Sequence, residues 1–74
     1  GTISVDTNGK VYLGAAEVDS ARMQAAIRDL VTQRPNARIV VRADRATSYK
    51  HIRKVLRDCA EVGAREVVYA TYEG

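Results

Sequence analysis

Residues 38–63, RIVVRADRATSYKHIRKVLRDCAEVG, decide how this chain folds. Within them, residues 39–41 are a short apolar run rich in β-branched side chains, which is typical of an interior strand. The polar residues 42–48 lead to a helix whose apolar positions recur at helical spacing. Gly63 is well placed to end that helix in a left-handed conformation. The stretch therefore predicts a buried strand, a polar connection and an amphipathic helix. The apolar stripe of this helix is Ile52, Val55, Leu56 and Cys59.

The first thirteen residues predict a β-hairpin. Ile3 and Val5 alternate with polar residues, as in a half-buried strand. Asn8-Gly9 follows, and both residues tolerate the positive φ of a type I′ turn. Residues 11–13 are then the returning strand, and residues 14–17 are expected to be a connection.

A first helix is predicted between the hairpin and residue 38. Asp19 is the expected N-cap, because its carboxylate can accept hydrogen bonds from the free amides of the first turn. Pro35 ends the helix, since the residue before a proline avoids the helical region. The apolar stripe of this helix is Met23, Ala26, Ile27, Leu30 and Val31.

The expected order is therefore β-β-α-β-α-β, with residues 66–72 as the last strand. Compact strand-helix-strand units form parallel crossovers of one hand. We therefore expect one α/β domain over residues 1–74, an α+β two-layer sandwich in which both helices cover one face of a mixed sheet. If the odd residues of 39–43 face the helices, Val40, Arg42 and Asp44 face outward. The last strand then exposes one of two alternating sets, either Val67, Tyr69 and Thr71 or Val68, Ala70 and Tyr72.

Composition bounds the possible functions. The single cysteine excludes an internal disulfide, and a domain of 74 residues buries too little surface to be more than marginally stable, so dimerisation or a partner is expected. Within these 74 residues, no apolar run approaches the length of about 18 residues that would span a membrane, and no stretch has the pattern of a signal peptide. The net charge of +3 permits contact with anionic surfaces without demanding nucleic acid.

No residue pattern points to catalysis or to a cofactor. His51 is the only histidine and is expected on the solvated side of its helix, so no zinc site can form with it. Cys59 lies in an apolar stripe and is expected to be a buried, inert thiol. Gly9, Gly14 and Gly63 match turns and no phosphate-binding loop. We therefore predict that the chain is not an enzyme and holds neither a metal nor another cofactor.

Two polar features remain open. Asp44 follows a buried strand, where α/β proteins place functional residues, yet the same aspartate could organise its loop by bonding backbone amides. The second helix carries a basic stripe opposite its apolar one. That stripe is either an ordinary solvated face, softened by Asp58 and Glu61, or a docking surface for acidic partners, anionic lipid headgroups or acidic wall polymer. The stripe consists of Lys50, Arg53, Lys54 and Arg57.

Taken in order, these features have the spacing of a known family. The matching positions are Ile3, Val5, Asp6, Gly9, Lys10, Val11, Tyr12, Leu13, Val18, Leu30, the Val41-Arg42-Ala43-Asp44 segment, Tyr49, Val55, Gly63 and residues 67–71. The chain resembles the periplasmic domain of the ExbD/TolR biopolymer-transport family. The Arg-Ala-Asp segment with the tyrosine that follows looks more like the ExbD branch than the TolR branch.

The resemblance implies a single-pass inner-membrane protein whose transmembrane helix, with its acidic residue, precedes this domain in the periplasm. Its implied partners are an ExbB/TolQ-like membrane subunit and a TonB/TolA-like protein, in a complex driven by proton-motive force. The proton-carrying acid would lie outside these 74 residues.

The first hypothesis is therefore a coupling module that forms a homodimer and binds a partner segment, by strand addition at a sheet edge. Its expected partner-binding residues are the basic stripe with Arg42, Asp44 and Tyr49. Its expected dimer or edge contacts are Val68, Tyr69 and Tyr72. The alternatives are a TolR-like peptidoglycan anchor and a small nucleic-acid-binding domain. The last lacks paired sheet aromatics and a GXXG loop, so no nucleic acid is expected as a partner.

Overall fold

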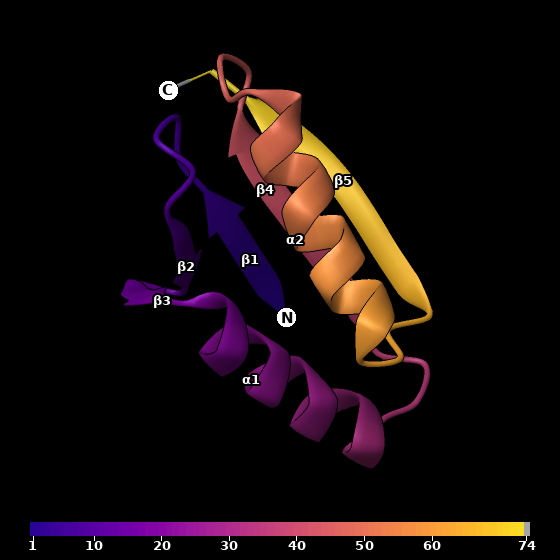
Figure 1. Ribbon diagram of the computed structural model, residues 1–74. Helices are drawn as coiled ribbons and strands as arrows, with labels where there is room; N and C mark the ends of the chain where they lie inside the picture. Colours follow the sequence, from indigo (N-terminus) through magenta and orange to yellow (C-terminus); the bar gives the residue numbers. More distant parts are fainter. Residues whose placement is uncertain (74) are drawn as a thin grey trace.

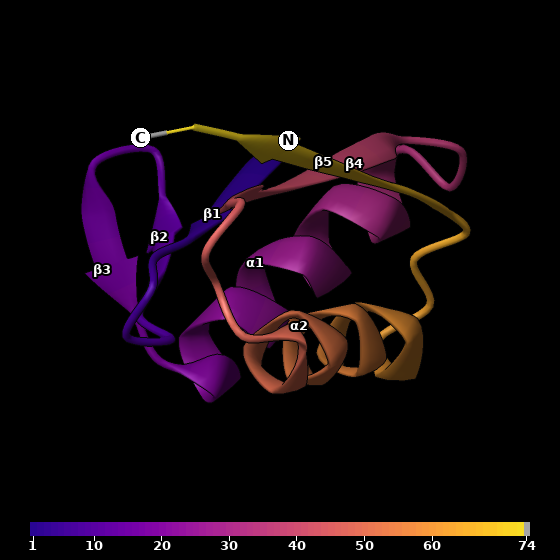
Figure 2. The ribbon, with the colours of Figure 1, turned by 90° about the horizontal axis from the view of Figure 1, so that it is seen from above.

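The computed structural model describes residues 1–73, which fold into two layers (Figure 1). The elements are β1 (Thr2–Val5), β2 (Val11–Leu13), β3 (Ala16–Val18), α1 (Ser20–Gln33), β4 (Arg38–Asp44), α2 (Tyr49–Glu61) and β5 (Glu66–Tyr72). Seen from above, both helices lie on one side of the sheet and leave its other face uncovered (Figure 2). The predicted two-layer fold with a mixed sheet is confirmed.

The five strands are arranged in the order β3-β2-β1-β4-β5. The hairpin strands β1, β2 and β3 pair antiparallel, whereas β1, β4 and β5 run parallel to one another. Parallel neighbours need a crossover, and α1 and α2 supply the two that are required. The edges of the sheet are therefore β3 on one side and β5 on the other.

One element differs from the prediction. Residues 14–17 were expected to be a connection, but Ala16–Val18 forms the strand β3. Gly14 adopts a φ of 59°, so the chain turns back and pairs Leu13 with Ala16 and Val11 with Val18. A segment of three residues is too short for its hydrophobic pattern to predict a strand. Pairing with β2 is what makes Ala16–Val18 a strand.

The turn between β1 and β2 also differs in type. Gly9 alone has positive φ in this turn, at 85°, so the predicted type I′ turn at Asn8-Gly9 is wrong. The Asp6 carbonyl accepts from the Gly9 amide at 3.0 Å, and the Asp6 carboxylate accepts from the amides of Asn8 and Lys10 at 2.9 and 2.8 Å. The Asp6 side chain thus supplies an alternative turn geometry, which a count of favourable turn residues does not reveal.

The helix boundaries follow the predicted signals in most respects. Asp19 caps α1, and its Oδ1 accepts from the Arg22 amide at 2.8 Å. Gly63 has a φ of 90° after α2, as predicted. Ser48 occupies the N-cap position of α2, but its side chain makes no capping hydrogen bond. Ala26 is exposed, so the buried part of the α1 stripe is narrower than expected.

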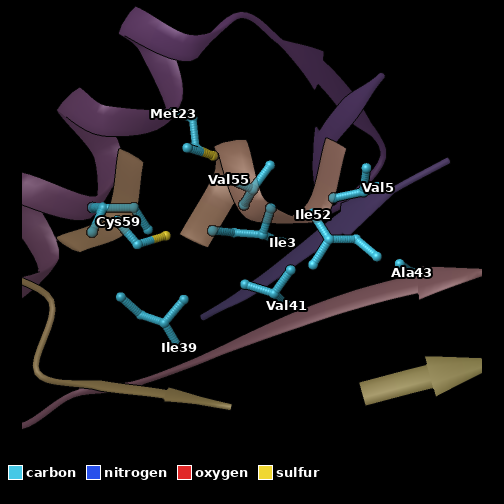
Figure 3. Packing of buried hydrophobic residues seen from close by; sticks show 10 residues of the cluster. Ile3, Val5, Met23, Ile39, Val41, Ala43, Ile52, Val55 and Cys59 are labelled. Atoms are coloured by element: carbon cyan, nitrogen blue, oxygen red, sulfur yellow. The ribbon is translucent and has the colours of Figure 1, made fainter. Parts of the chain in front are cut away.

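The core lies between the sheet and the helices (Figure 3). Burying each large aliphatic side chain stabilises the fold by about 1.5–3 kcal/mol. Burial also raises the pKa of the Cys59 thiol to about 11, so this cysteine is the inert core residue that was predicted. The buried apolar residues are Ile3, Val5, Met23, Ile27, Ile39, Val41, Ala43, Ile52, Val55 and Cys59.

Candidate partner-binding surface

β5 forms a long free edge of the sheet in the described part of the chain. β5 has seven residues and pairs with β4 along its whole length, while no described strand lies on its other side. A strand in this position presents unpaired N–H and C=O groups to any extended segment that approaches it. Figure 1 shows β5 in yellow along the outside of the sheet.

The hydrogen bonds identify which groups on β5 are free. The Arg45 amide donates to the Tyr72 carbonyl at 2.8 Å, so the main chain of Tyr72 faces β4. Main-chain direction alternates along a strand. The N–H and C=O groups of Val67, Tyr69 and Thr71 therefore point away from the sheet.

The side chains of β5 alternate in the same way between the two faces. Val68, Ala70 and Tyr72 pair in register with outward-facing residues of β4, so they lie on the uncovered face. Tyr69 lies on the helix side instead. The predicted edge set is thus divided: Val68 and Tyr72 share one face, and Tyr69 belongs to the other.

Exposure within this set is uneven. Val68 and Tyr69 are each 42% exposed, so both offer apolar surface at this edge. Tyr72 is half-buried, and the Arg42 guanidinium lies 4.9 Å from the centre of its ring. This cation–π contact ties β4 to β5 across the uncovered face.

The structure separates the residues expected around the β4–α2 loop. Arg42 contacts Tyr72 on the uncovered face, whereas Tyr49 begins α2 in the other layer and is 61% exposed. Asp44 organises the loop: its Oδ1 accepts from the Ala46 amide at 2.8 Å and its carbonyl from the Thr47 amide at 2.9 Å. The three predicted residues therefore do not form one cluster.

The basic stripe of α2 is largely as predicted. Lys50, Arg53 and Arg57 are exposed and make no ion pair within residues 1–73. Lys54 differs, because its Nζ lies 3.4 Å from the Asp58 carboxylate. The free positive charge on the outer face of α2 is therefore carried by three residues and not by four.

Asp58 was expected on the solvated face, and that expectation is wrong. The residue is only 8% exposed, and its Oδ2 accepts from the Ser20 hydroxyl at 2.5 Å as well as from Lys54. Gln24 joins the same network by donating to the Asp58 carbonyl and to Glu61, both at 3.0 Å. A buried carboxylate needs such partners, and here they join α2 to α1. The sequence did contain a signal for this burial. At 100° per residue, Asp58 lies around the helix axis between the buried Val55 and the exposed Lys54, at the border of the apolar stripe.

His51 was expected to be solvated, but it is half-buried against the β1–β2 turn. A Cβ atom on Gly9 would lie 2.6 Å from His51 Nδ1. The closeness of the ring and the positive φ both require glycine at this position. The contact packs the hairpin turn onto α2.

A cavity of about 280 Å³ lies where this turn, the β3–α1 junction and α2 meet. Met23, Val55 and Val18 contribute apolar surface to it. Its buried carboxylate, Asp58, is already bonded to Ser20 and Lys54. No group of three or more His, Cys, Asp or Glu side chains within residues 1–73 could hold a metal ion.

Tyr12 is the other residue with a perturbed proton affinity. Partial burial, followed by the nearby Asp6 and Glu17 carboxylates, raises the pKa of Tyr12 above its ordinary value. Its hydroxyl donates to Asp6 Oδ2 at 3.4 Å. Tyr12 is therefore a neutral hydrogen-bond donor at physiological pH.

Neither of the two helices is both long and apolar enough to cross a membrane, which holds for the whole described range of 1–73.

Comparison with known proteins identifies the family of this chain. The family model described as biopolymer transport protein ExbD/TolR matches residues 1–74. Biopolymer transport protein ExbD of Neisseria gonorrhoeae is 24% identical over 72 residues, which cover 93% of this chain and 50% of that protein. The same protein of Neisseria meningitidis serogroup C gives the same figures. The chain thus spans about half the length of the curated relatives it matches. It belongs to the ExbD/TolR family of biopolymer transport proteins.

Proposed function

We propose that this chain is the periplasmic domain of an inner-membrane protein in an energy-transduction complex driven by proton-motive force. The family match over the whole chain supports this role. The domain couples the membrane motor to an envelope or outer-membrane partner through protein–protein contact, and it performs no catalysis. Its partners in this proposal are an ExbB/TolQ-like membrane subunit and a TonB/TolA-like protein.

The free edge of β5 is the observation that carries the coupling role. Seven residues of unprotected edge, with three sets of outward main-chain groups, suit the addition of one more strand. Main-chain hydrogen bonds then supply affinity, and alternate side chains supply selectivity. The same edge, with Val68 and Tyr69, is available for a homodimer contact when no partner is bound.

A second role is supported by a different surface. Lys50, Arg53 and Arg57 place three unpaired cations on the outer face of α2. An acidic polymer such as peptidoglycan could be held there, as in a TolR-like wall anchor. This contact would be sensitive to salt, because exposed charges are screened over about 8 Å at physiological ionic strength.

An NMR titration of the chain distinguishes the two roles. The ¹⁵N-labelled domain is titrated separately with a TonB-like periplasmic segment and with soluble peptidoglycan fragments. Coupling predicts that the segment shifts the amides of Val67, Tyr69 and Thr71 most. Shifts confined to α2, and only with the glycan, would replace the coupling role by the anchor. Silence with both ligands would overturn the partner assignment.

A pair of substitutions tests the edge itself. Thr71→Pro removes an outward N–H and leaves the ladder to β4 in place, so binding of the segment should fall more than tenfold. Thr71→Val keeps the N–H and serves as the matched control. Equal binding by the two variants would show that the segment does not pair with β5.

A further inference from the structure

We infer that the segment that pairs with the β5 edge is acidic, and that it alternates acidic side chains toward α2 with apolar side chains toward the uncovered face. This inference rests on the proposed docking at β5 and adds the chemistry of the occupant. It follows from four features of the shelf formed by β5 and the adjacent flank of α2.

The first feature is the direction of the free backbone. Val67, Tyr69 and Thr71 present their main-chain groups outward and their side chains toward the helix layer. In a paired strand, directly opposite residues share a face. Residues of the added strand that lie opposite these three positions therefore point toward α2, and their neighbours point to the uncovered face.

The second feature is the incomplete cover over β5. Tyr69 faces the helix layer and is nevertheless 42% exposed, and Thr71 is exposed as well. α2 lies over β4 and does not reach across the outer strand (Figure 1). Space therefore remains beside α2 for the side chains of one more strand.

The third feature is the orientation of α2. Asp58 bonds to Ser20 and His51 packs on Gly9, so these two residues mark the flank that faces α1 and the hairpin. A turn of 100° per residue places Tyr49 and Arg53 on the opposite flank, toward β5. Arg53 is exposed and makes no ion pair within the described chain.

The fourth feature is the charge balance around the edge. The acidic side chains there are already engaged: Glu66 lies 3.6 Å from Arg38, and Glu73 pairs with Arg45. Lys50, Arg53 and Arg57 have no such partner within residues 1–73. The uncompensated charge beside the shelf is therefore positive, and it favours carboxylates on the helix side of the added strand.

The uncovered side has the opposite chemistry. Val68 is 42% exposed beside the half-buried Val40, and Ala70 is exposed next to it. Apolar cross-strand pairs stabilise a sheet, and the cation on this face, Arg42, is already stacked on the Tyr72 ring. The occupant therefore combines both chemistries with a period of two residues.

Three synthetic probes test this pattern. They are capped nine-residue peptides of alternating Val and Glu, of alternating Val and Lys, and of the Val/Glu composition with the glutamates in one block. Methylation of amides on one edge of each peptide limits self-association. Binding is followed by fluorescence anisotropy, and the contact is located by ¹⁵N amide shifts.

The alternating acidic peptide should bind most tightly and shift Val67, Tyr69 and Thr71. Arg53→Glu should weaken it about fivefold or more and should favour the lysine peptide instead, because the charge pairing is reversed. Arg28→Glu makes the same change in net charge on an exposed position of α1, and it should leave the preference unchanged.

Three outcomes would overturn the inference. Equal binding of the block and alternating peptides would indicate a general attraction of polyanions to α2. A preference that ignores the Arg53 charge would remove the acidic specificity. Tighter binding of the lysine peptide to the native chain would reverse it. In each case the Thr71→Pro test still decides separately whether a segment pairs with β5. A failure of the acidic pattern can therefore be told apart from a failure of the proposed docking at β5.

Discussion

The two edge strands of the sheet differ in length and in the chemistry of their side chains. β3 has three residues, follows a tight turn and runs directly into the Asp19 cap of α1. β5 has seven residues and carries exposed Val68 and Tyr69. Proteins commonly protect edges by shortening or charging them, and β3 is protected in this way, with Glu17 at its centre. The difference shows that the fold closes one edge and leaves the other available.

The largest expected effect on stability comes from removing backbone N–H groups of β5, and it depends on whether the N–H faces β4 or points outward. Ala70→Pro removes an N–H that faces β4, so it should lower the free energy of unfolding by about 2–3 kcal/mol. Thr71→Pro removes an outward N–H and should cost less than about 1 kcal/mol. Urea denaturation followed by circular dichroism measures both. Similar losses would mean that the inferred direction of the β5 backbone is wrong.

The next effect compares the two turns that flank β2. Gly9→Ala meets both a positive φ and the His51 ring, and should cost about 2 kcal/mol. Gly14→Ala, near the closed edge, has positive φ but open space, and should cost about 1 kcal/mol. The His51→Ala background should bring the two glycine variants closer together in denaturation midpoint. An unchanged gap would show that the ring contact contributes nothing.

A smaller effect tests whether the network between the helices sets the shelf beside β5. Ser20→Ala removes the hydroxyl that donates to Asp58, and should cost about 1 kcal/mol. Thr32→Ala, whose hydroxyl donates only to the Arg28 carbonyl within α1, is a control of the same kind at an exposed site. Amide shifts of Arg53 and Tyr69 should change in the first variant alone. Matching shifts in both variants would show that this network does not determine how α2 lies beside the open edge.

The last effect appears only at alkaline pH, and it acts on both edges alike, through the core. The raised pKa of Cys59, about 11 against 9.0 for a free thiol, means that the folded state favours the neutral thiol. Its contribution to stability is therefore complete below pH 9 and is lost as pH rises through 11, at up to about 1.4 kcal/mol per pH unit. Comparison with Cys59→Ala over pH 8–11 isolates this slope from the titration of lysines and tyrosines. Parallel curves for the two proteins would contradict the predicted titration.

Much of the fold was predictable because local signals agreed with one another. The apolar run of residues 39–41 correctly marked an interior strand, and Asp19 and Gly63 marked helix ends correctly. β3 was not predictable in this way, since three residues become a strand only beside β2. The type of the first turn was missed because the Asp6 side chain determines it.

The candidate site was predictable in composition and not in arrangement. Tyr69 and Val68 were expected together, yet alternation along β5 sends them to opposite faces. Arg42 and Tyr49 are near in sequence and lie in different layers, while Arg42 meets Tyr72 from the far end of the chain. Asp58 was misplaced because its partner Ser20 lies 38 residues away. Such contacts depend on the packing of distant elements.

The parallel order of β1, β4 and β5 has a mechanical consequence. Thr2 begins β1 at one end of the sheet, and Tyr72 finishes β5 at the other end, with β4 between the two strands. Tension that enters at Thr2 and leaves at Tyr72 runs along the strands and shears both parallel ladders. The hydrogen bonds of each ladder then share the load together and do not open one after another. The chain is therefore geometrically suited to transmit a pull along its length.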